Sequence, residues 1–94
     1  MESILDRAFF ESRLGQKFQI GEVPAEVTLV QCNQLKSQAG EMRGPFSLVF
    51  RGPAEAFLPQ RTYALKHEQT ETLYIFLVPI ASDADGFSYE AVFN

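Results

Sequence analysis

The hydrophobic pattern is strongest in the last third of the chain, where two strand-like runs flank an Asp-Gly turn. Residues 73–80 are apolar at both odd and even positions, and residues 87–94 follow the turn made by residues 81–86. Asp-Gly between two such runs is a strong short-range signal for a hairpin. A strand that is apolar on both faces must be covered on both, so residues 73–80 are expected at the centre of the fold.

Shorter alternating runs precede this hairpin, and each predicts a strand. In the run 61–67, the alternation turns Tyr63 and Leu65 inward and Thr62 and Lys66 outward. The other runs cover residues 17–20, 26–32 with an extension toward 35, and 46–51. Pro79 removes one ladder donor from the run 73–80, so we expect a bulge or an open position there.

The N-terminal residues predict a helix that begins near Ser3 and ends near Gly15. Its apolar residues form two arcs at helical spacing, one through residues 4, 5, 8 and 9, and one through Phe10 and Leu14. Two arcs fit two arrangements. The helix either plugs an open end or face of the sheet, or keeps one face for a partner.

The order of these elements predicts an α+β domain. Short connections favour antiparallel neighbours, and no helical crossover is present that would make a parallel sheet. We therefore expect residues 1–94 to form a single domain, with the N-terminal helix packed on a bent antiparallel sheet of about six strands. The sheet is expected to form a small closed or nearly closed barrel. If nothing covers its outside, Tyr74, Phe76 and Val78 form an exposed patch that marks an interface.

Composition and charge narrow the classes of partner. The 94 residues carry a net charge of −4, and their eight basic residues are scattered along the chain. Nucleic acid and anionic membrane surfaces both require clustered Lys and Arg, so neither is an expected partner. The single cysteine, Cys32, excludes an intramolecular disulfide and is expected to be a buried structural thiol. With no signal-peptide pattern and no run long enough to span a bilayer, we expect a cytoplasmic protein.

Four charged side chains are candidates for ligand binding. Arg51, Arg61 and Glu90 lie within or beside apolar strands, and His67 is the only histidine. A pair of arginines can clasp a carboxylate or phosphate, whereas pairing of these charges with one another would be structural. His67 has glutamates near it in the sequence, which is half of an acid–base site, but its place at a hairpin end is typical of solvated surface.

No metal, cofactor or catalytic site is predicted. The segment Asp83-Ala84-Asp85-Gly86 looks like part of a calcium loop, yet Ala81 and Val92 stand where such a loop requires oxygen ligands. A tight turn is therefore the better interpretation of this segment. One histidine and one cysteine do not make a zinc ligand set.

The chain also resembles a small bacterial family of unknown function. The resemblance covers nearly the whole chain, is most specific at the ending, and is weakest at residues 36–44. The matching residues are Phe10, Leu14, Gly15 and Phe18, together with 46–53, 58–63, 76–80 and the ending DADGFSYEAVFN at 83–94. The resemblance carries over no activity. It implies an accessory or assembly role, because members of the family are often encoded beside proteins similar to phage tail collar or tail-fibre proteins.

Together these observations favour a non-enzymatic interaction or assembly accessory protein, which would bind a protein partner or self-associate. The interface candidates are Phe10, Leu14, Tyr74, Phe76 and Val78. The alternative is a small ligand-binding or enzymatic β-barrel. Its pocket would be lined by phenylalanines and gated by the candidate cations named above.

Overall fold

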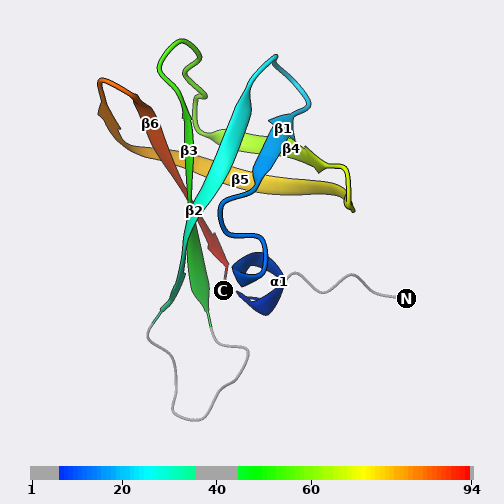
Figure 1. Ribbon diagram of the computed structural model, residues 1–94. Helices are drawn as coiled ribbons and strands as arrows, with labels where there is room; N and C mark the ends of the chain where they lie inside the picture. Colours follow the sequence, from blue (N-terminus) through cyan, green and yellow to red (C-terminus); the bar gives the residue numbers. More distant parts are fainter. Residues whose placement is uncertain (1–6, 36–44, 94) are drawn as a thin grey trace.

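The computed structural model describes residues 7–35 and 45–93, and most of them lie in β-strands (Figure 1). The elements are α1 (Arg7–Glu11), β1 (Lys17–Ile20), β2 (Glu26–Gln34), β3 (Phe46–Pro53), β4 (Arg61–His67), β5 (Thr70–Asp83) and β6 (Gly86–Phe93). The predicted α+β class is therefore corrected to a mostly β fold, because the described helix has only five residues. The predicted helix start at Ser3 and residues 36–44, where the family resemblance is weakest, lie outside the described residues.

The six strands form a closed ring in the order β1-β2-β3-β6-β5-β4, and every neighbouring pair is antiparallel. The prediction of a bent antiparallel sheet of six strands is thereby confirmed. The ladders differ greatly in length. The β3–β6 ladder runs from Phe46–Phe93 to Pro53–Gly86, whereas β1 and β4 close the ring through Gln19–Lys66 and Ile20–Leu65 alone.

Strand β5 belongs to both halves of the ring. Residues 70–77 pair with β4, and residues 78–83 pair with β6. The register shifts between Pro79 and Ala81, so the predicted irregularity at Pro79 is confirmed. A proline has no N–H to donate, and a bulge at this point lets the strand bend from one neighbour to the next. Figure 1 shows β5 crossing behind β2, β3 and β6.

The inward face of the ring holds the core. The predicted inward residues of β4, Tyr63 and Leu65, are buried, and the predicted outward residues, Thr62 and Lys66, are exposed. The core is rich in aromatic residues, which bury large apolar areas. Its fully buried members include Phe18, Leu29, Phe50, Leu77 and Tyr89.

Helix α1 lies at one end of the ring, near the end of β6 (Figure 1). The ring of Phe10 is fully buried and lies 6.0 Å from the ring of Phe46 and 5.5 Å from that of Phe93. This position matches a helix that plugs an end of the sheet. It also corrects one interface candidate, because Phe10 fills the core between two strand ends and offers no surface to a partner.

Candidate functional site

The four predicted ligand residues each contact different neighbours. Arg51 lies on β3 opposite Ser88, close to the β5–β6 turn, and Arg61 is the first residue of β4. His67 ends β4, and Glu90 is half-buried on β6, opposite Val49 on one side and Val78 on the other. Within residues 7–35 and 45–93, no hydrogen bond or ion pair joins any of these four residues to another.

Arg51 is held by structural contacts. Its guanidinium donates hydrogen bonds to Asp83 Oδ1 at 2.7 Å and to Ser88 Oγ at 2.8 Å. The same Asp83 oxygen accepts the backbone N–H groups of Asp85 at 2.9 Å and Gly86 at 3.1 Å. The hydrogen bond from Arg51 and these N–H groups lower the pKa of the Asp83 carboxyl. The segment 83–86 is thus a tight turn tied to β3.

Arg61 is exposed, and its guanidinium carbon lies 5.3 Å from the centre of the Tyr63 ring. A cation over an aromatic face gains a modest electrostatic attraction. The Tyr63 hydroxyl in turn donates a hydrogen bond to the carbonyl of Pro59, at the end of the preceding loop. These contacts anchor the start of β4, and neither arginine is positioned opposite the other as the two-arginine clasp requires.

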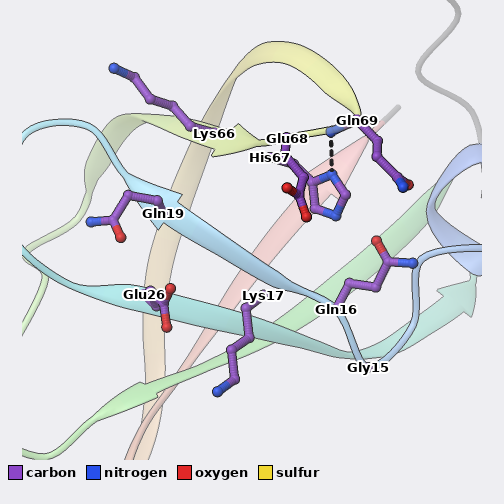
Figure 2. Close-up of a pocket in the computed structure, with 9 residues that line it drawn as sticks. All are labelled: Gly15, Gln16, Lys17, Gln19, Glu26, Lys66, His67, Glu68 and Gln69. Carbon is purple, nitrogen blue, oxygen red and sulfur yellow. Dashed lines mark hydrogen bonds between the residues drawn. The ribbon is translucent and has the colours of Figure 1, made fainter.

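A polar depression of about 620 Å³ opens where β1 and β4 separate, and we call it the seam groove (Figure 2). The two strands are paired only at Gln19–Lys66 and Ile20–Leu65. Toward the start of β1 they diverge, and side chains line the space between them. The lining residues are Gly15, Gln16, Lys17, Gln19, Glu26, Lys66, His67, Glu68 and Gln69.

His67 is the one predicted ligand residue in the seam groove. Its Nδ1 accepts a hydrogen bond from the backbone N–H of Gln69 at 3.0 Å, and its ring centre lies 5.2 Å from that of Phe18. The side chain is half-buried and points into the groove beside Glu68 (Figure 2). Two contacts therefore fix the imidazole, whereas the sequence indicated a freely solvated side chain.

Two polar residues near His67 were not predicted from the sequence. Gln16 Oε1 and Thr70 Oγ1 are buried, and neither has a hydrogen-bond partner among the described residues. Thr70 is the ladder partner of His67, and Gln16 faces the imidazole from the other side of the groove. Glutamine and threonine are mostly exposed in proteins, so the burial of these two oxygens can be recognised only from the packing of the folded chain.

The predicted interface residues on β5 form an exposed row, which we call the outer strip: Tyr74, Phe76, Val78 and Ile80. Tyr74 is 71% exposed, Phe76 49% and Ile80 50%, and Val78 is half-buried. The alternate residues of the same strand, from 73 to 77, point inward and are buried. Leu14, the remaining candidate, is 46% exposed in the turn after α1.

Cys32 is half-buried on β2, and its Sγ lies 3.8 Å from the carbonyl oxygen of Arg7. Burial raises the pKa of this thiol, which keeps it in the unreactive protonated form. Within residues 7–35 and 45–93, no three His, Cys, Asp or Glu side chains are grouped to hold a metal ion. No helix in this part of the chain is long and apolar enough to cross a membrane.

Comparison with known proteins identifies the family. The chain belongs to DUF6916, a domain of unknown function, whose family model matches residues 5–93. No curated protein and no solved structure matches the chain. The family assignment supports the sequence resemblance to a domain of unknown function and adds no activity to it.

Proposed function

We propose that this member of the DUF6916 family is a non-enzymatic interaction or assembly protein, which docks a protein partner or a second copy of itself on the outer strip. The observation that carries the proposal is the exposure of Tyr74 and Phe76 side by side on the outward face of β5. Large aromatic side chains are enriched at the centres of protein interfaces. Their exposure gives the isolated chain no stability, so contact with a partner is the function that explains them best.

The backbone of β5 also favours the outer strip as a docking site. Residues 73–77 form their ladder with β4, and the other edge of this segment has no ladder partner among the described strands. An unpaired strand edge is a template for another strand, and such edges are usually blunted by lysine or proline. Residues 73–77 contain neither. A partner strand would gain both main-chain hydrogen bonds and aromatic contacts here.

The setting we propose is the bacterial cytoplasm, with an accessory role in a phage-tail-like system. This part of the proposal is supported by the sequence resemblance and by Cys32, a single thiol that suits a reducing compartment. The scattered basic residues favour a protein over a nucleic acid as partner.

A second candidate function is the binding of a small ligand, and the seam groove is the observation that favours it. The groove differs from the predicted phenylalanine-lined pocket, because its lining is polar. No particular phenylalanines were predicted to line that pocket, and four of them pack in the core: Phe10, Phe18, Phe46 and Phe50.

Affinity purification of the tagged full chain from its source cells, followed by mass spectrometry, tests the main proposal. We expect one dominant stoichiometric partner, or a defined homo-oligomer by sedimentation. The double variant Tyr74→Ser/Phe76→Ser should lose the partner and keep its fold, because both side chains are exposed. The matched control is Val30→Ser, which removes an exposed apolar side chain from β2. A monomer with no partner, or equal loss in the control, contradicts the proposal.

A further inference from the structure

The outer strip continues from β5 onto the outward faces of β6 and β3. Val78 on β5 is the ladder partner of Glu90 on β6, and Glu90 is in turn the partner of Val49 on β3. The neighbours of Glu90 along β6, Tyr89 and Ala91, are buried in the core, so Glu90 points outward. Glu90 and both valines are half-buried. One carboxylate therefore lies between two apolar side chains on the outer surface of the sheet.

The carboxylate of Glu90 is unpaired in the part of the chain that the structure describes. Within residues 7–35 and 45–93, no hydrogen bond or ion pair joins it to another group. The next outward residue of β6, Val92, is 52% exposed, and Phe76 on the outer strip is 49% exposed. Water stabilises a charge on an open surface, so the free chain tolerates Glu90 beside these apolar residues.

Docking on the outer strip would change the surroundings of this carboxylate. Val78 belongs to the outer strip and lies directly beside Glu90, so a partner that covers the strip removes water from both. A carboxylate that loses water without gaining a counter-charge opposes binding strongly, whereas a cation placed against it compensates. A partner that binds tightly here must therefore bring a basic side chain to Glu90.

A second copy of the chain does not offer that cation on the same face. Arg51 is the only lysine or arginine in β3, β5 and β6, and its guanidinium is already bound to Asp83 and Ser88. Each copy also carries a net charge of −4, so two copies repel one another at long range. The occupant that fits this face is a different protein.

We infer that the outer strip and Glu90 together bind a different protein, whose apolar docking surface carries one Lys or Arg that pairs with the Glu90 carboxylate. Tyr74 and Phe76 supply the apolar contact, and Glu90 selects against partners that lack the cation. The inference rests on the proposed function of the outer strip and adds the chemistry of the partner.

The substitution Glu90→Gln tests the charge, because it keeps the shape of the side chain and removes its negative charge. The protein recovered from the source cells is titrated with the purified full chain, and we expect at least about tenfold weaker binding of this variant. Glu26→Gln is the matched control. It removes the same charge from an exposed position on β2, outside the outer strip, and should leave the affinity unchanged.

Equal or tighter binding of Glu90→Gln overturns the inference. Against a partner surface without a cation, neutralising the carboxylate removes a desolvation cost, and binding strengthens. Against a cation it removes the attraction, and binding weakens. Glu90→Asp keeps the charge, so it should bind more tightly than Glu90→Gln.

Thermal unfolding of the isolated chain separates binding from folding. Because Glu90 has no ion pair within the described residues, Glu90→Gln should melt within about 3 °C of the wild type. A larger fall that accompanies the weaker binding would show a structural glutamate and overturn the inference.

The inference and the proposed function fail in different ways. If Tyr74→Ser/Phe76→Ser loses the partner while Glu90→Gln binds like the wild type, the outer strip remains the docking site and the inference alone fails. A homo-oligomer that dissociates in the same double variant has the same meaning, since the occupant is then a second copy. A wild-type chain that recovers no partner and stays monomeric contradicts both.

Discussion

The hydroxyl of Tyr89 shows how one buried polar atom fastens a loop to the ring. Tyr89 is fully buried on β6, and its hydroxyl accepts the backbone N–H of Leu58 at 2.9 Å. Burial raises the pKa of Tyr89, so the hydroxyl stays neutral at physiological pH. Leu58 is itself buried, which places the middle of the β3–β4 connection in the core. The neighbouring Phe57, in contrast, is 52% exposed.

The variant Tyr89→Phe should destabilise the protein by about 1–3 kcal/mol, because the buried Leu58 N–H loses its acceptor. Urea unfolding measures the change. Tyr74→Phe is the control, since the Tyr74 side chain is 71% exposed, and its effect should stay within about 0.5 kcal/mol. Equal effects of the two substitutions would refute the role given to this hydrogen bond.

At the scale of elements, specific hydrogen bonds fix the turn of the β5–β6 hairpin. Asp83 and Gly86 are paired at its end, with two residues between them. The Asp83 carboxylate accepts two backbone N–H groups within the turn and one guanidinium from β3. The Asp83 side chain thus links β3, β5 and β6, and the strength of these contacts depends on its negative charge.

Stability should fall in acid through Asp83. Its pKa in the folded protein lies below the ordinary value of 3.8, so the ionised form stabilises the fold. That contribution is complete above the pKa of the unfolded chain and is lost as the pH falls through the folded pKa. Unfolding of wild type and Asp83→Asn, measured from pH 7 down to pH 2, should give curves that converge in acid. A constant difference over this range would rule out the charge as the cause.

Gly86 should tolerate no side chain. Its φ is +154°, and a Cβ at this position would overlap the carbonyl oxygen of Gly52 on β3. Gly86→Ala should therefore cost at least about 1–3 kcal/mol through steric strain and a shifted backbone. The control is Gly15→Ala, where φ is +87° and no atom lies within 4 Å, so only the backbone strain of about 1–2 kcal/mol remains. Urea unfolding should rank Gly86→Ala as the more damaging change, and the reverse order would contradict this account.

At the scale of the whole molecule, a short ladder closes the ring. Beside the β1–β4 pairs, Gly21 N–H donates to Ala64 O at 2.8 Å, and the Glu22 carboxylate accepts Ala64 N–H at 3.1 Å. The Glu22 carboxylate thus accepts a backbone N–H that the carbonyl of a paired strand residue would accept in a longer ladder. The ring is thus weakly joined at the point where the seam groove opens, and strongly joined along β3 and β6.

Local patterns were enough to predict most of the sheet. Alternation placed Tyr63 and Leu65 inward, Asp-Gly predicted the hairpin, and Pro79 predicted the bulge. The seam groove was not predictable, because it depends on where β1 and β4 part, which no local signal encodes. The burial of Phe10 depends likewise on contacts with Phe46 and Phe93 from distant strands. Both failures arise from long-range packing.

Hydrogen–deuterium exchange along β5 tests the central claim, that a partner docks on the outer strip. The measurement compares the dilute full chain with the assembly purified from its source cells. In the dilute chain, alternate amides of residues 73–77 should exchange fast, because they face the edge without a ladder partner. In the assembly these amides should be protected, as a docked strand or side-chain contact requires. Unchanged exchange at residues 73–77, with protection elsewhere on the chain, would contradict the account.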